Sequence, residues 1–147
     1  MINLQNNAKI LARKRDESNS LYENYARKNG LQGKSLLILM WIYYTKGGIT
    51  QNIISEKTYS TKQVVNATIK SFEKKGYIYY EDSSRDKRKK LVKLTKEGYI
   101  FASKILDPLE EAEINSISKL SNEQQQVFIE CFKVFNNNMK ENIGKLL

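Results

Sequence analysis

Apolar residues recur at helical spacing through most of the chain, and glycines fall between the periodic segments. Residues 36–44 form a continuous apolar run, which predicts a buried central helix because no side of it is polar. Residues 61–75 place Val65, Ile69 and Phe72 on one stripe, at spacings of four and three. The pattern therefore predicts a mainly helical protein with short connections.

Longer helices are predicted on both sides of this central region. The first covers residues 4–28, and a later one carries Pro108, where a kink or a break is expected. The last helix follows a capping box formed by Ser121 and Gln124. Its wide apolar stripe needs a cover, which a second copy of the chain can supply. The residues expected at this dimer interface are Leu11, Phe128, Phe132, Phe135, Met139 and Ile143.

The middle of the chain combines two helices with a hairpin. Thr50 is expected to cap a short helix at residues 51–57, and Ser60 to form a capping box with Gln63 at the start of a longer one. Residues 77–94 then predict two short strands joined by a basic loop, and Thr95 is expected to cap the helix that follows. This is the order of a winged helix-turn-helix. The expected fold class is mainly α, with a small antiparallel β-hairpin wing and flanking N- and C-terminal dimerisation helices.

Charge is distributed unevenly. The formal net charge is +9, and residues 61–96 hold eleven Lys and Arg against four Asp and Glu. Residues 97–130 hold two Lys and Arg against seven Asp and Glu. One part of the chain is therefore suited to a polyanion such as DNA, although a run of charge can also be no more than a solvated face.

A winged helix-turn-helix contacts duplex DNA through the start of its second helix, in the major groove, and through its wing. Arginine suits the wing because a narrow minor groove concentrates negative potential. The expected DNA-binding residues of the helix are Ser60, Thr61, Lys62, Gln63, Asn66 and Lys70. Those of the wing are Arg85, Asp86, Lys87, Arg88 and Lys89, and Lys90 and Lys93 are expected to contact phosphates as well.

Several classes of protein are disfavoured by composition. The chain has no histidine and one cysteine, which excludes a His-based metal site, a Ser-His pair and a disulfide framework within one chain. No pair of carboxylates or nucleophile stands out, so neither an enzyme nor a cofactor is expected. Cys131 lies among apolar residues and is expected to be a buried structural thiol rather than a redox sensor. The absence of a signal segment and of an apolar run of about 20 residues predicts a cytoplasmic protein without a membrane partner.

Two further features have competing interpretations. Residues 30–35, GLQGKS, resemble the end of a P-loop, but Lys28 stands where the first glycine is required and no strand precedes it, which disfavours a nucleotide site. Aromatic residues could line an effector pocket or simply pack in the core, and packing is the favoured interpretation. They are Tyr22, Tyr25, Trp41, Tyr43 and Tyr44.

Residues 49–98 resemble the winged-helix core of the MarR family of bacterial transcription regulators. The family's wing pattern, Asp-x-Arg followed by Leu-Thr-x-x-Gly, matches Asp86, Arg88, Leu94, Thr95 and Gly98. The resemblance implies a homodimer with interlocking terminal helices that binds a pseudo-palindromic operator. It also implies that Arg88 enters the minor groove, that Asp86 helps to hold it, and that a small aromatic or acidic effector releases the DNA.

The resemblance implies a single domain over residues 1–147, with dimerisation helices at 1–30 and 99–147 and the DNA-binding region at 34–98. Val64, Ala67 and Tyr80 depart from common family patterns, so the operator sequence does not follow from relatives. The expected function is that of a homodimeric repressor. The alternatives are a ligand-independent nucleic-acid-binding protein, a regulator like the related SarA proteins, and an interaction protein whose basic face meets acidic protein or lipid.

Overall fold

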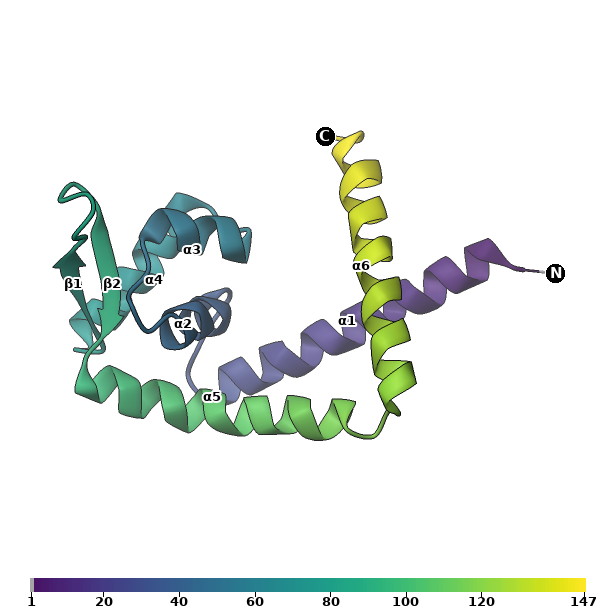
Figure 1. Cartoon of the computed structure of the whole chain (residues 1–147), viewed down its shortest axis with the longest axis horizontal. Helices are drawn as coiled ribbons and strands as arrows, with labels where there is room; N and C mark the ends of the chain where they lie inside the picture. Colours follow the sequence, from purple (N-terminus) through teal and green to yellow (C-terminus); the bar gives the residue numbers. More distant parts are fainter. Residues whose placement is uncertain (1) are drawn as a thin grey trace. The chain divides into compact units, whose positions relative to one another are not determined.

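The computed structural model describes residues 2–147 and shows helices together with one two-stranded sheet (Figure 1). The elements are α1 (Leu4–Lys28), α2 (Ser35–Tyr44), α3 (Gln51–Thr58), α4 (Lys62–Lys74), β1 (Ile78–Asp82), β2 (Lys90–Leu94), α5 (Lys96–Ile117) and α6 (Asn122–Gly144). The predicted fold class, mainly α with a small antiparallel hairpin in a winged helix-turn-helix, is confirmed. The bounds predicted for the first helix are those of α1.

The chain divides into two compact units, Met1–Leu106 and Asp107–Leu147. The boundary falls inside α5, so the first unit contains α1 to α4, the hairpin and the first half of α5. The second unit contains the rest of α5 and α6. The winged helix-turn-helix therefore lies wholly within the first unit.

The core of the first unit takes buried side chains from helices and hairpin alike. Ile38 and Leu39 of α2 are fully buried, as the apolar run predicted, and so are Val65 and Ile69 of the predicted α4 stripe. The largest fully buried side chains are Ile38, Leu39, Ile54, Ile69, Leu106, Val65, Val92 and Thr58. Because Val92 belongs to β2, hydrophobic burial fixes the hairpin against the helices that precede it.

The hairpin pairs Ile78 with Leu94 and Tyr80 with Val92 in antiparallel register. β1 extends to Asp82, which pairs with Lys90 at the end of the ladder. A third segment joins the sheet edge through an isolated bridge that the sequence did not reveal. The amide of Ile49 donates to the carbonyl of Val92 at 3.2 Å, and the amide of Val92 donates back at 2.7 Å.

The junction of the hairpin with α5 explains the Leu-Thr-x-x-Gly pattern. The hydroxyl of Thr95 accepts a hydrogen bond from the amide of Gly98 at 3.0 Å and donates to the carbonyl of Gly76 at 2.6 Å, so Thr95 caps α5 as predicted. The amide of Thr95 also donates to the carbonyl of Tyr77 at 3.0 Å. A side chain at Gly98 would place its Cβ 1.8 Å from the Tyr77 carbonyl oxygen. The Leu-Thr-x-x-Gly pattern thus supplies Thr95 as the cap of α5. It also supplies Gly98, which has no side chain and lets the backbone of α5 lie close to the backbone of Tyr77.

The cap of α4 differs from the prediction. Thr61, not Ser60, is the N-cap, because the Thr61 hydroxyl accepts the amide of Val64 at 3.2 Å. The hydroxyl of Ser60 instead accepts a hydrogen bond from Thr58 Oγ1 at 2.8 Å. The predicted capping box of Ser60 with Gln63 is therefore wrong. The box of Ser121 with Gln124 is confirmed, with both of its hydrogen bonds present.

Of the kink or break expected near Pro108, the break is absent, since α5 runs unbroken from Lys96 to Ile117. Proline removes the amide that would bond to the carbonyl of Lys104, one turn earlier. Both residues are exposed, so water can satisfy that carbonyl and the helix continues.

In the second unit, α6 exposes its apolar stripe. Phe128, Phe132, Phe135 and Ile143 are between 41% and 58% exposed, and the rings of Phe128 and Phe132 stack with centroids 6.1 Å apart. Cys131 is exposed as well, so the expectation of a buried thiol is wrong for the single chain. The apolar neighbours that suggested burial lie on a helix that its own chain does not cover.

Candidate nucleic-acid interface

The outer face of α4 is polar and open. Burial of its inner stripe turns Lys62, Gln63, Asn66 and Lys70 outward, and all four are exposed. Thr61 is exposed too, but its hydroxyl is engaged in capping. The helix thus presents one ammonium and two carboxamides within its first two turns, which are the groups that pair with base edges and phosphates.

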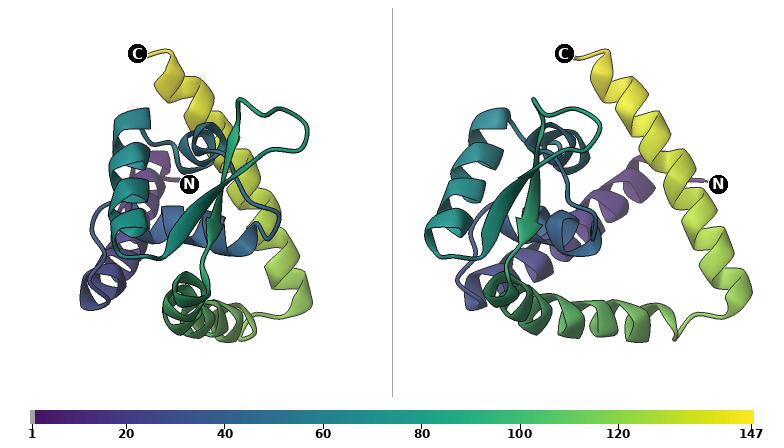
Figure 2. Two further views of the ribbon diagram at one scale, coloured as in Figure 1. Left: turned by 90° about the vertical axis from the view of Figure 1, so that its left-hand side faces the viewer. Right: turned by 60° about the vertical axis from the view of Figure 1, so that its left-hand side comes forward.

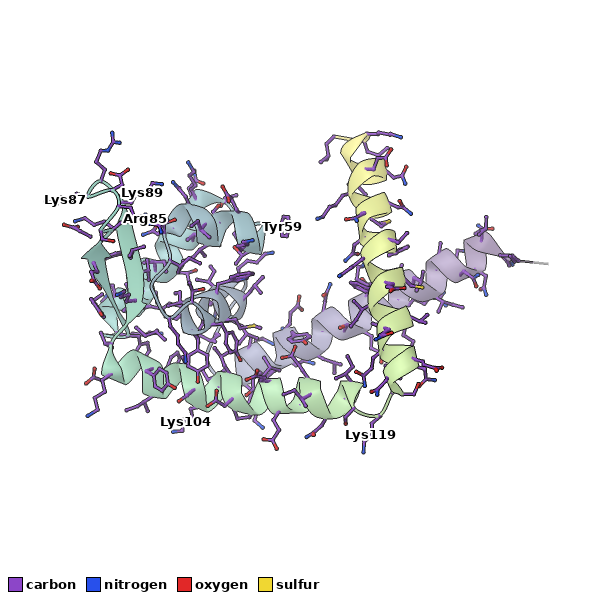
Figure 3. All side chains as sticks on the ribbon, in the orientation of Figure 1. Tyr59, Arg85, Lys87, Lys89, Lys104 and Lys119 are labelled. Atoms are coloured by element: carbon purple, nitrogen blue, oxygen red, sulfur yellow. The ribbon has the colours of Figure 1, made fainter. Side chains whose placement is uncertain are left out.

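The predicted contact Ser60 lies in the turn between α3 and α4. Its hydroxyl already bonds to Thr58, so it acts first as a turn residue. The neighbouring Tyr59 has a left-handed backbone with φ of 53° and is 79% exposed (Figure 3). This compact turn sets the angle at which α4 leaves α3.

A cleft of about 320 Å³ lies between the two helices of the helix-turn-helix. Lys62, Gln63 and Asn66 of α4 line one side, and Gln51 and Asn52 of α3 line the other. The first three were predicted as DNA-binding residues, and the last two were missed. The one signal for them in the sequence was the Thr50 cap, which places both in the first turn of a helix.

The wing loop is held in shape by Asp86. Its carboxylate accepts hydrogen bonds from the backbone amide of Arg88 at 3.0 Å and from Arg88 Nε at 3.2 Å. These two bonds hold the pKa of Asp86 below its usual range, which keeps the carboxylate ionised. The Arg88 side chain is 92% exposed, against 31% for Asp86. Asp86 therefore shapes the loop while Arg88 extends into solvent.

The cations of the wing fall into two groups. Lys90 forms an ion pair with Asp82, and Lys93 forms one with Glu81 at 2.6 Å, across the hairpin. The bond to Glu81 raises the pKa of Lys93. The cations of the loop itself are exposed at its tip (Figure 3). They are Arg85, Lys87, Arg88 and Lys89. The excess positive charge is thus concentrated at the tip rather than along the strands.

The tip of the wing and the N-terminal end of α4 face the same side of the first unit. Both views of Figure 2 show the hairpin loop and the start of α4 at its upper side, while the end of α4 and the start of α5 lie at the opposite side. The bridge between Ile49 and Val92 joins the segment before α3 to the wing. The first unit therefore presents the polar helix, the cleft and the basic loop together.

Tyr80 of β1 is near Gln51, which lines the cleft, and near Glu73 of α4. Burial raises the pKa of its hydroxyl, nearby Glu73 of α4 raises it further, and a hydrogen bond with the Gln51 side chain opposes the rise.

Other candidate sites receive little support. The ammonium of Lys34, in the GLQGKS segment, donates to the carbonyl of Thr58 at 3.0 Å and so serves the helix-turn-helix itself. Among the suggested pocket aromatics, Tyr43 packs against Tyr44 and Tyr99, and the Tyr25 hydroxyl donates to the carbonyl of Ile105 at 2.6 Å. These contacts are typical of packing. Within residues 2–147 no cluster of His, Cys, Asp or Glu is arranged to hold a metal ion.

Over the described part of the chain, no helix combines the length and the apolar character that crossing a bilayer requires.

Comparisons with known proteins agree with this geometry. The model of the MarR family matches residues 29–89. NMB1585, a MarR family regulator from Neisseria meningitidis, has a similar structure with a TM-score of 0.76 at 19% identity, covering 95% of this chain and 97% of that one. No curated protein matches the sequence.

Two further structures were solved with ligands. A mutant of MepR from S. aureus, bound to an oligodeoxyribonucleotide, has a TM-score of 0.54 at 18% identity, with 100% of both chains covered. The PcaV transcriptional regulator from Streptomyces coelicolor, in complex with its natural ligand, has a TM-score of 0.65 at 14% identity, covering 93% of this chain and 96% of that one. At these identities the likeness shows a shared fold.

Proposed function

From the premise that this chain belongs to the MarR family of transcriptional regulators, through its core at residues 29–89, we propose that it is a homodimeric repressor that binds a specific DNA operator. The observation that carries this proposal is the placement of the α4 N-terminus and the wing loop on one side of the first unit. A regulator of this kind works where the chromosome lies, so we place it in the cytoplasm of a bacterial cell.

Each part of the surface has a distinct role in this proposal. α4 enters the major groove, where Gln63 and Asn66 pair with adenine edges and Lys62 with guanine or phosphate. Arg88 enters the adjacent minor groove, held by Asp86. Lys87 and Lys89 contact phosphates and supply affinity that does not depend on sequence.

A second copy of the chain completes the site. The exposed stripe of α6 and Leu11 of α1, which is 48% exposed, are apolar surfaces that a partner subunit would bury. A twofold dimer presents two α4 helices, and these match half-sites separated by one helical turn, about 34 Å. On this basis residues 1–30 and 99–147 are dimerisation helices, residues 34–98 are the DNA-binding region, and the operator is pseudo-palindromic.

An effector would act by changing the distance between the two α4 helices of the dimer. We consider a second state of the dimer in which the distance between the two α4 helices is different. A small aromatic or acidic molecule that binds better to this second state shifts the dimer towards it, and the DNA is released. The complex of PcaV with its natural ligand and the complex of a MepR mutant with an oligodeoxyribonucleotide support the proposal that an effector and DNA are the partners.

The proposal is tested by selecting genomic fragments of the source organism with purified protein and then competing the recovered duplex against random DNA and RNA. We expect recovery of a palindromic duplex that random DNA displaces only at large excess. Equal competition by random DNA or RNA would favour a general nucleic-acid-binding protein. No shift of any duplex at low salt would favour a protein whose basic face meets acidic protein or lipid.

Affinity for the selected duplex should fall steeply with salt. Each cation that neutralises a phosphate contributes about −0.9 to the slope of log affinity against log salt, so Lys87 and Lys89 of two subunits together give a slope of roughly −3.6, and further phosphate contacts make it steeper. Fluorescence anisotropy between about 50 and 200 mM salt measures it. A flat response would contradict phosphate contacts.

Replacing Arg88 with Ala should weaken operator binding about 10- to 100-fold, because a well-placed side chain in a groove contributes about 1–3 kcal/mol of discrimination. Arg88→Lys should recover only part of this loss, since an ammonium lacks the planar fork of Arg. Arg15→Ala, on exposed α1, is the matched control for the loss of one positive charge. Unchanged binding by Arg88→Ala would remove the wing from the mechanism.

A further inference from the structure

We infer that Lys34, the N-cap residue of α2, is a positioning residue for the N-terminal end of α4, and that it acts by holding the last turn of α3 against α2. This inference rests on the proposed function, because it concerns how the helix that meets the bases is aimed. It also gives the GLQGKS segment a role other than that of a nucleotide site.

The ammonium of Lys34 meets the C-terminal end of α3. Its Nζ donates to the carbonyl of Thr58 at 3.0 Å, and Thr58 is the last residue of that helix. The last four carbonyls of a helix have no amide partner within the helix, and this end carries a partial negative charge that attracts an ammonium. Lys34 therefore caps the end of α3 from outside, across to the start of α2.

A second lysine connects the same two helices in the reverse direction. Lys57, in the last turn of α3, places its ammonium 5.6 Å from the ring centroid of Trp41 in α2, which is within the range of a cation–π contact. Lys34 and Trp41 are about two helical turns apart along the chain. A single contact would leave the end of α3 free to pivot, whereas two separated contacts fix its direction against α2.

The turn after α3 transmits this direction to α4. The amide of Ser60 donates to the carbonyl of Ser55 at 3.1 Å, and the Ser55 hydroxyl donates back to the carbonyl of Ser60 at 2.5 Å. The hydroxyl of Thr58, a fully buried residue, lies 2.8 Å from Ser60 Oγ. Thr61, the N-cap of α4, follows directly. A displacement of the end of α3 therefore displaces the first turn of α4 as well.

Lys34 is an exposed residue, so a direct contact with a DNA phosphate is the alternative role. The geometry favours positioning, because the ammonium already bonds to a carbonyl oxygen and would lose that bond on turning to a phosphate. The two roles differ in what they do to binding. A phosphate contact adds to the salt dependence and acts on every sequence, whereas the aim of α4 affects only the contacts that read bases.

Lys34→Met tests the inference, because it keeps an unbranched apolar stem and removes the ammonium. Binding to the selected duplex should weaken about three- to tenfold, the effect of losing one hydrogen bond from a charged group. Binding to random duplex and the slope against salt should both stay as in wild type. Lys34→Arg should restore most of the loss, since a guanidinium also donates to a carbonyl. Unfolding midpoints, measured alongside, confirm that each variant is folded.

Lys75→Met is the matched control, since Lys75 is an exposed lysine at the C-terminal end of α4, on the side of the first unit opposite to the wing tip. It should bind both duplexes like wild type. Equal losses from Lys34→Met on both duplexes, with a slope against salt that is shallower by about 1.8 for two subunits, would identify a phosphate contact and overturn the positioning role.

The fluorescence of Trp41, the one tryptophan of the sequence, tests the contact between α2 and α3 without DNA. Its emission should change in Lys34→Met, because Lys57 moves with the end of α3, and should match wild type in Lys34→Arg and Lys75→Met. Unchanged emission in Lys34→Met would overturn the inference.

Wild-type binding of the selected duplex separates the inference from the proposed function. If the wild type binds and Lys34→Met keeps its full preference for the selected duplex over random duplex, the inference fails and the proposed function stands. If the wild type binds no duplex, the proposed function fails, and with it the role of Lys34 in aiming α4.

Discussion

Replacing Phe132 with Glu is expected to convert the proposed dimer into monomers. Phe132 is 54% exposed in the single chain and stacks on Phe128 in the centre of the α6 stripe. Burying a carboxylate in an apolar interface without a partner costs several kcal/mol, which is enough to dissociate a dimer of ordinary affinity. Sedimentation velocity should show a species near the monomer mass of 17.1 kDa in place of one of twice that mass.

The same change should reduce operator affinity by about two to four orders of magnitude, because linking two half-site contacts in one particle raises affinity by that factor. Gln126→Glu introduces the same charge at an exposed position on the opposite side of α6 and should leave both mass and affinity unchanged. A stable dimer in Phe132→Glu would refute the α6 interface.

Replacing Gly98 with Ala should destabilise the chain by about 3 kcal/mol or more, at the upper end of the range for overpacked sites. The new Cβ would lie 1.8 Å from the Tyr77 carbonyl oxygen and 2.7 Å from its carbon. Both are backbone atoms, so no side-chain rotation relieves the clash. The start of α5 must separate from the base of the hairpin, which breaks the hydrogen bonds that Thr95 makes there.

Denaturant unfolding at equilibrium measures this effect, and Gly47→Ala is the control. A Cβ at Gly47 meets nothing within 4 Å, so that variant should unfold within about 1 kcal/mol of wild type. Equal stability of Gly98→Ala and Gly47→Ala would contradict the close approach. Because domains of this size have only about 5–15 kcal/mol of stability, Gly98→Ala should also lower the amount of folded protein at physiological temperature.

Features that depend on local pattern were predictable from the sequence. The stripe of α4, the capping box of Ser121 and the order of helices and strands each follow from periodicity or from a single hydrogen-bonded motif. The prediction that Ser60 caps α4 was wrong because Ser60 and Thr61 can each cap a helix. The choice depends on the αL backbone of Tyr59 and on the bond between Ser60 and Thr58, which are properties of the folded turn.

Features that depend on contacts between elements were not predictable. The bridge at Ile49 involves one residue and leaves no periodic signal. Gln51 and Asn52 become part of a cleft only because α3 and α4 pack together. The exposure of Cys131 was missed because an apolar neighbourhood in the sequence does not specify which face of α6 its own chain covers. In each case the missing information is which elements pack together in the tertiary structure.

The central claim is that two wings of a dimer enter two minor grooves of one duplex on either side of the operator centre. Directed cleavage tests it most directly, with an iron chelate attached to Lys87→Cys at the exposed tip and with Cys131→Ser removing the one native thiol. We expect two clusters of strand cleavage in the minor groove, placed symmetrically about the centre of the selected operator. A single cluster, or cleavage spread evenly along the duplex, would contradict the account.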